Sequence, residues 1–201
     1  KKGKQMSQNK TRLRNAPKRV LNKPFLHVQD LKPNGSNGGD SVVGWNPRDL
    51  NTILTNQIPG ATLTNNQVTL PAGDYYIEAT APTRSAGTGT ILYLRNAAGD
   101  YLLKGPTGGI SSSEVGCAIS PVAGNLSLPA TTTIYLDHWC AVAVPGYGLG
   151  NLNSVTDDDD SYSELRIWKR DSDLETTLDT DPSMVPAMRV KYVGYEEQGG
   201  T

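Results

Sequence analysis

The chain has 201 residues, of which 21 are glycine and 13 are proline, and its formal net charge is only −1. No apolar run approaches the roughly 20 residues of a membrane-spanning helix, so we expect no membrane partner. This length allows one domain with extensions, and the many Gly, Pro, Thr and Asn residues favour short strands joined by turns over helices.

The first segment, residues 1–24, is strongly basic. It holds nine cations and no carboxylate: Lys1, Lys2, Lys4, Lys10, Arg12, Arg14, Lys18, Arg19 and Lys23. The rest of the chain keeps 19 − 9 = 10 basic residues against all 20 acidic ones, so a net charge of +9 precedes a net charge of −10. This asymmetry predicts a polyanionic or acidic partner for the arm. We favour an anchor peptide on a protein surface, and nucleic acid and a merely solvated tail remain the alternatives.

The segment LTNNQVTLPAGDYYIEATAP, from Leu63 to Pro82, predicts two strands joined at a Pro-Ala-Gly turn. In its second half Tyr75, Ile77 and Ala79 alternate with Tyr76, Glu78 and Thr80. A period of two between apolar and polar residues indicates a sheet that is buried on one side, as in an antiparallel sandwich.

Three other segments contribute to one family pattern. Phe25 to Ile58 contains a first strand, a Gly/Asn loop, a Trp and then RDLNT before the next strand, whereas TIYLDHWC and YSELRIWK have the form of the last two strands. Together with Leu63 to Pro82, these motifs resemble the jelly-roll head domain of many phage and other viral structural proteins. That domain is a relative of the tumour necrosis factor and complement globular-head superfamily.

The resemblance implies an all-β, antiparallel jelly-roll β-sandwich over residues 25–170 that assembles as a homotrimer. We expect the interface to draw on Tyr76, Tyr93, Tyr101, Tyr135 and Trp139, and the core to contain Trp45 and Trp168. Tyr75 and Ile77, on the apolar side of their predicted strand, are further candidates for the core or the trimer contact.

Residues 171–201 form an extension beyond the last predicted strand, with seven acidic residues. Within it, Met188, Val190 and Tyr192 alternate with other residues and predict an additional edge strand. Such a strand could extend its own sheet or that of a neighbouring subunit.

Residues with catalytic or metal-binding potential are few. Cys117 and Cys140 are interpreted as two buried thiols, with a disulfide as the less favoured alternative, and His138 is interpreted as structural. The glycines of Gly146 to Asn151 predict a loop between the last two strands. The run Asp157, Asp158, Asp159 and Asp160 predicts a solvated loop more strongly than a Ca²⁺ site. No enzymatic activity and no cofactor are expected.

The sequence therefore predicts a non-enzymatic virion structural protein, located in the virion as a capsid decoration, minor-capsid or fibre-base component held by its terminal arms. Its partners would be two further copies and other virion proteins. One alternative is a receptor-binding tail-fibre tip whose loops, Thr83 to Thr90 and Leu149 to Tyr162, contact a host glycan or protein. Another is a jelly-roll coat protein whose basic arm binds the genome.

Overall fold

The structure is a computed structural model that describes residues 23–84, 89–108, 117–152 and 157–170. All of the regular elements in these ranges are β-strands, and none of the described chain forms a helix able to cross a membrane. The predicted basic arm, apart from Lys23 and Pro24, and the whole of residues 171–201, including the predicted edge strand, lie outside the described residues.

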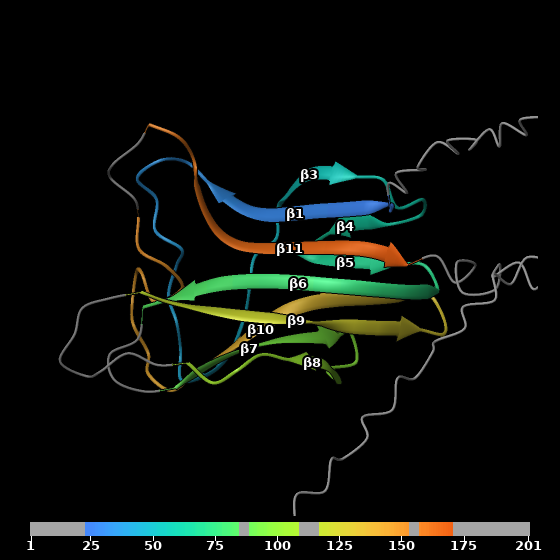
Figure 1. Cartoon of the computed structure of the whole chain (residues 1–201). Helices are drawn as coiled ribbons and strands as arrows, with labels where there is room; N and C mark the ends of the chain where they lie inside the picture. Colours follow the sequence, from blue (N-terminus) through green and yellow to red (C-terminus); the bar gives the residue numbers. More distant parts are fainter. Residues whose placement is uncertain (1–22, 85–88, 109–116, 153–156, 171–201) are drawn as a thin grey trace, which may run out of the picture. The chain divides into compact units, whose positions relative to one another are not determined.

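Two antiparallel sheets face each other and form the predicted jelly-roll sandwich (Figure 1). The five-stranded sheet has the order β3 (Thr52–Asn56), β1 (Phe25–Lys32), β11 (Asp160–Arg170), β6 (Gly73–Thr83) and β9 (Ala118–Leu128). The six-stranded sheet has the order β4 (Thr62–Thr64), β5 (Gln67–Leu70), β10 (Thr132–Cys140), β7 (Thr90–Asn96) and β8 (Tyr101–Lys104), and β2 (Gly44–Pro47) pairs with β10.

The core lies between the two sheets and follows from the alternation seen in the sequence. On β6, Tyr75, Ile77 and Ala79 are at most 3% exposed, whereas Tyr76 on the same strand is 36% exposed. Buried leucines of β7 and β10 occupy the facing layer of the core. Removing these side chains from water is the main favourable term that holds the two layers together.

The Pro-Ala-Gly turn predicted between β5 and β6 does not make a hairpin. The two strands belong to opposite sheets, so residues 71–72 carry the chain from one layer of the sandwich to the other. The hairpin lies one strand earlier, where Asn65 and Asn66 join β4 to β5 with φ of 50° and 63°. A two-residue turn with both central residues in the left-handed region matches the right-handed twist of the strands that it connects.

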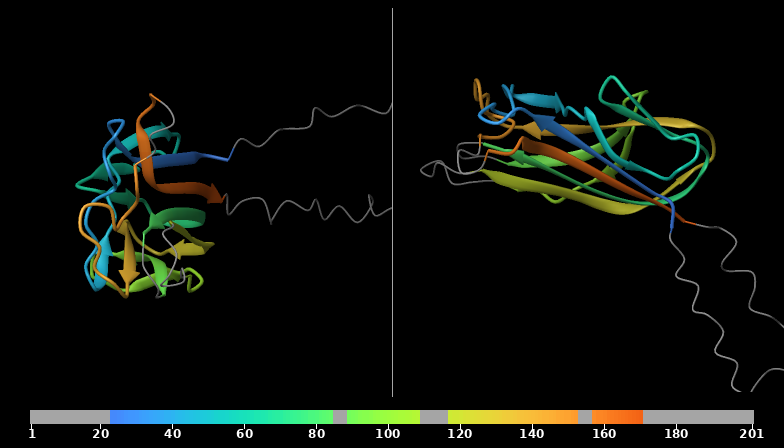
Figure 2. Two further views of the ribbon diagram at one scale, coloured as in Figure 1. Left: turned by 90° about the vertical axis from the view of Figure 1, so that its left-hand side faces the viewer. Right: turned by 90° about the horizontal axis from the view of Figure 1, so that it is seen from above.

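One end of the described sandwich holds both ends of the described chain, and the other end holds several of the connections between strands. Phe25 pairs with Trp168, and the Lys169 N–H donates to Pro24 O at 2.9 Å, so the chain enters and leaves the sandwich at adjacent positions. The connections that follow β1, β6, β8 and β10 start at the opposite end, as Figures 1 and 2 show. We call the end that holds Pro24 and Lys169 the terminal end of the sandwich, and the opposite end, where these connections start, the loop end.

Candidate assembly faces and the loop end

The outer face of the five-stranded sheet carries an aromatic row made of Phe25, Tyr76 and Trp168. The three residues are register partners on neighbouring strands, because Trp168 lies opposite Phe25 on one side and opposite Tyr76 on the other. Their ring centroids are 4.9 Å apart for Phe25 and Trp168 and 5.9 Å apart for Tyr76 and Trp168. The expected core position of Trp168 is therefore wrong. Its neighbour Ile167 points inward, so Trp168 must point outward.

A charged strip made of His27, Gln29, Glu164 and Arg166 lies on the same face, next to the aromatic row. Glu164 Oε1 lies 2.5 Å from His27 Nε2 and 2.6 Å from Arg166 Nη2, and it accepts a hydrogen bond from Gln29 Nε2 at 3.1 Å. Apolar rings beside a hydrogen-bonded ionic strip are typical of the centre and rim of a protein interface.

The outer face of the six-stranded sheet carries a second aromatic cluster. Trp45 of β2 is 36% exposed and Tyr101 of β8 is 57% exposed, and Tyr93 of β7 contacts both rings. Trp45 was expected in the core, but it pairs with Trp139 on β10 and shares the outward side of that strand, whereas its neighbour Asn46 is buried. The inward position is thus occupied by Asn46 rather than by the tryptophan.

The residues proposed from the sequence for the core and the interface are therefore distributed over three places. The core holds Tyr75 and Ile77, the outer face of the five-stranded sheet holds Tyr76 and Trp168, and the outer face of the six-stranded sheet holds Trp45, Tyr93, Tyr101, Tyr135 and Trp139. Tyr135 and Trp139 are half-buried. No single contact surface can include all of the aromatic residues expected at the interface.

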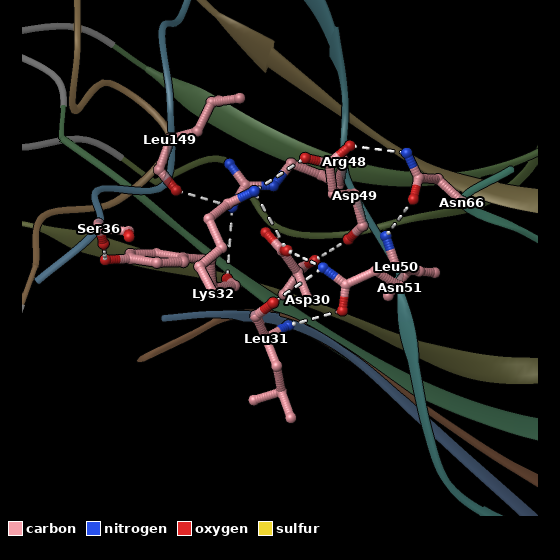
Figure 3. Close-up of polar contacts among 12 residues, drawn as sticks. Asp30, Leu31, Lys32, Ser36, Arg48, Asp49, Leu50, Asn51, Asn66 and Leu149 are labelled. Atoms are coloured by element: carbon pink, nitrogen blue, oxygen red, sulfur yellow. Dashed lines mark hydrogen bonds and ion pairs between the residues drawn. The ribbon is translucent and has the colours of Figure 1, made fainter. Parts of the chain in front are cut away.

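At the loop end, a buried cation joins segments that are distant in sequence (Figure 3). Arg48, on the connection from β2 to β3, is 2% exposed, and its guanidinium donates to Pro82 O at 3.3 Å, Leu149 O at 2.7 Å and Tyr162 O at 3.4 Å. Burial lowers the pKa of Arg48 to about 10, so the group is still charged at neutral pH. It holds the end of β6, the loop before β11 and β11 itself in fixed relative positions.

Acidic groups next to Arg48 extend the network. Asp30 is 1% exposed. Its Oδ1 lies 3.3 Å from Lys32 Nζ and accepts a hydrogen bond from Asn51 Nδ2 at 2.9 Å. Burial raises the pKa of Asp30, against the opposing effect of Lys32. Lys32 Nζ also lies 3.0 Å from Asp49 Oδ2, and Asn66 Nδ2 donates to Asp49 Oδ1 at 2.7 Å. The RDLNT motif contains Arg48, Asp49 and Asn51, yet the sequence alone indicated only a strand start there.

A groove of about 470 Å³ opens at the loop end. Its lining includes Thr80, Pro82, Ile119, Asp159, Asp160 and Tyr162. Asp157, Asp158 and Asp159 are exposed as expected of a solvated loop, but Asp160 is 8% exposed and begins β11. Among the described residues no group of three or more His, Cys, Asp or Glu side chains could hold a metal ion.

The two cysteines and His138 do not form a common site that is open to solvent. Cys117 is exposed and Cys140 is buried, and both are free thiols, so the expectation of two buried thiols holds only for Cys140. His138 Nε2 lies 3.1 Å from Ser120 Oγ, which lies 3.1 Å from Thr90 Oγ1, and all three residues are at most 1% exposed. Burial lowers the pKa of His138 to about 3, so the imidazole is neutral and acts as a polar core group.

No protein-family model and no curated protein matches this sequence. Among solved structures, murine APRIL at pH 5.0 matches with a TM-score of 0.51 and 10% identity, over 74% of this chain and 99% of that one. The globular domain of zebrafish complement 1qA matches with a TM-score of 0.45, 15% identity and coverages of 73% and 96%. Eiger TNF from S. frugiperda matches with a TM-score of 0.47, 16% identity and coverages of 74% and 94%. The APRIL match confirms the predicted jelly-roll fold.

Proposed function

We propose that this chain is a non-enzymatic structural protein of a virion, in which the jelly-roll domain forms a homotrimer and the terminal segments attach it to the particle. The observation that carries the proposal is the aromatic row on the outer face of the five-stranded sheet, where Tyr76 is 36% exposed on an open sheet face. Clustered exposed rings on an open face mark interaction surfaces, because leaving them in water is unfavourable.

The charged strip supports the same use of this face. A closed ring of three copies requires that two different surfaces of each chain fit together around one axis. The aromatic row supplies apolar area, and the polar contacts of Glu164 with His27 and Arg166 supply directional contacts that favour one register. The order of the sequence motifs, which resembles viral head domains, supports three copies and a virion as the setting.

The terminal end of the sandwich supports the attachment. Because Pro24 and Lys169 are hydrogen-bonded neighbours, residues 1–23 and 171–201 are attached to the domain at adjacent points. An attachment through this end would leave the loop end of the domain facing outward. The protein would then be a capsid decoration, minor-capsid or fibre-base component.

The trimer is tested by the double variant Tyr76→Ala/Trp168→Ala. We expect light-scattering mass measurement to give three chains for the wild type and one chain for the variant, since the variant loses two of the three rings of the aromatic row. The matched control, Trp45→Ala/Tyr101→Ala, removes one Trp and one Tyr from the opposite sheet and should leave three chains. A wild type of one chain, or an unchanged mass in the first variant, would refute this use of the face.

The attachment is tested by removing residues 1–23. Full-length protein should co-sediment with genome-free particles, and the shortened chain should not. The nine cations of the arm favour a second candidate function, a coat protein that binds the genome. In that case neither form would bind empty particles, and only the full-length form would retain nucleic acid, which rising salt would release steeply.

A further inference from the structure

The second aromatic cluster has a geometry of its own on the six-stranded sheet. Trp45 and Tyr101 come from different strands and have ring centroids 5.7 Å apart, while Tyr93 lies 5.1 Å from Trp45 and 5.0 Å from Tyr101. More than a third of the surface of Trp45 (36%) and more than half of that of Tyr101 (57%) is exposed. The planes of these two exposed rings are tilted by 41° to each other, and together they form a shallow aromatic platform on the sheet.

The platform is held in place from within the sheet. The guanidinium carbon of Arg95 lies 4.1 Å from the ring centroid of Trp45 and 4.5 Å from that of Tyr101. Arg95 Nη1 in turn lies 2.8 Å from Asp137 Oδ2, whose side chain is only 2% exposed. Cation–π contacts and a nearly buried ion pair fix the rings before any ligand arrives, which reduces the ordering cost of binding.

Lys104 gives the platform a net charge. Its Nζ lies 5.9 Å from the Tyr93 ring centroid, its side chain is exposed, and it belongs to none of the ion pairs formed within the described ranges. Because Asp137 already balances Arg95, the ammonium of Lys104 is the excess charge at the edge of the rings. A complementary ligand is anionic and presents a flat face of C–H groups to the aromatic faces, which are electron-rich.

The exposed part of the rings indicates a small ligand. Trp45 and Tyr101 are the exposed rings of the cluster, whereas Tyr93 and the neighbouring Tyr135 and Trp139 on the same face are half-buried. The exposed aromatic area is therefore small compared with the roughly 800 Å² per partner of a standard protein interface.

We propose that Trp45, Tyr93, Arg95, Tyr101 and Lys104 form a binding site for a pyranose that carries a carboxylate. The C–H face of the sugar lies against Trp45 and Tyr101, and its carboxylate pairs with Lys104. The site is complete within one chain and does not depend on the trimer. If the domain does assemble through the five-stranded sheet, the opposite face is left open and three such sites act together.

The test is a titration of the full-length protein with methyl glucuronide, with methyl glucoside as the matched neutral sugar. Indole N–H signals are followed by nuclear magnetic resonance, and the signal of Trp45 is assigned from its loss in Trp45→Phe. We expect methyl glucuronide to shift the Trp45 signal and to leave that of Trp168, on the opposite sheet, in place. Methyl glucoside should bind about three- to tenfold more weakly, because it lacks the charge that meets Lys104.

Two variants separate the contributions. Lys104→Met keeps the aliphatic stem of an exposed residue and should lower the affinity for methyl glucuronide to that for methyl glucoside. Trp45→Ala/Tyr101→Ala should abolish binding of both sugars, as measured by saturation transfer to the sugar protons, whereas Tyr76→Ala/Trp168→Ala should leave the affinity per chain unchanged.

Three results would overturn the proposal. The first is the absence of a Trp45 shift at saturating methyl glucuronide, and the second is equal affinity for the two sugars. The third is a loss of mass in Trp45→Ala/Tyr101→Ala without sugar binding by the wild type, which would make this face a contact between copies. The first two results would not contradict assembly through the aromatic row, which is tested by Tyr76 and Trp168.

Discussion

Arg48 is a cation buried at the loop end, and its main partners are backbone carbonyls. Three carbonyl groups from separate segments accept its hydrogen bonds, and without the guanidinium they would be left with fewer donors in a site that excludes water. The residue is therefore expected to stabilise the relative positions of β6, β11 and the loop before it.

Arg48→Met should lower the free energy of unfolding by about 3 kcal/mol, since buried carbonyls lose charge-assisted donors. Urea denaturation of the variant and the wild type measures this change. Arg166→Met is the control, because the Arg166 side chain is 45% exposed and its contact with Glu164 should contribute less than about 1 kcal/mol. Equal losses in the two variants would contradict a special role for Arg48.

His138 makes stability depend on pH, because burial and the charge of Arg48 hold its folded-state pKa at about 3, whereas the ordinary pKa of histidine is 6.5. The unfolded chain therefore binds a proton more readily. Stability from the neutral imidazole is fully present above pH 6.5 and is lost as the pH falls from 6.5 towards 3. The raised pKa values of Asp30 and Asp137, due mainly to burial, act in the opposite direction in the acidic range.

Replacing His138 by Gln should remove this dependence. Between pH 7 and pH 5 the wild type should lose about 2 kcal/mol more unfolding free energy than His138→Gln, given about 1.36 kcal/mol per pH unit below the unfolded pKa. Urea unfolding at the two pH values gives the difference directly. Parallel pH profiles for the two proteins would show that His138 is not the group responsible.

At the scale of elements, the strands follow from local patterns more closely than the turns do. The alternating residues of β6 and the apolar positions of β5 predict these strands, whereas the turn predicted from the sequence lies at Pro-Ala-Gly and not at Asn65–Asn66. Asn tolerates the left-handed region better than other side-chain-bearing residues, so the Asn-Asn pair is a turn signal. Asn66 adds a tertiary contact, because its side chain binds Asp49 and the Leu50 N–H.

Two substitutions in this turn should behave differently. Asn65→Ala should destabilise the protein by about 1 kcal/mol, because alanine must adopt a positive φ, whereas Asn65→Gly should be nearly neutral. Asn66→Gly relieves the same backbone strain but loses the contacts to Asp49 and Leu50, so it should cost about 1 kcal/mol. Thermal unfolding of the three variants gives the order, and a stable Asn65→Ala protein would contradict the role of the turn.

At the scale of the whole molecule, residues 23–170 contain every strand and every core residue among those described. This chain should therefore fold alone with a melting temperature within about 2 °C of the full-length protein, since it holds all of the described core. Scanning calorimetry makes the comparison. A chain that ends at residue 158 is the control and should not fold, because it lacks β11 from the middle of the five-stranded sheet. A lower melting temperature of residues 23–170 would show that the extensions stabilise the domain.

The sequence by itself determined the fold class, the alternation that marks strands such as β6, and the separation of basic and acidic charge. Alternation is a local property, because the side chains of one strand point to opposite faces whatever the partner strand is. The resemblance of the motifs added the jelly-roll arrangement, which the structure confirms.

The tertiary structure alone decided which aromatic residues are on the outside and which polar residues are inside. Trp45 and Trp168 point outward because of their register with Trp139 and with Tyr76, and that register is set by strands distant in sequence. Arg48 is buried because carbonyls 34, 101 and 114 residues away converge on it. Local patterns encode which side chains alternate, but only the packing of the two sheets determines which face is covered and which groups meet there.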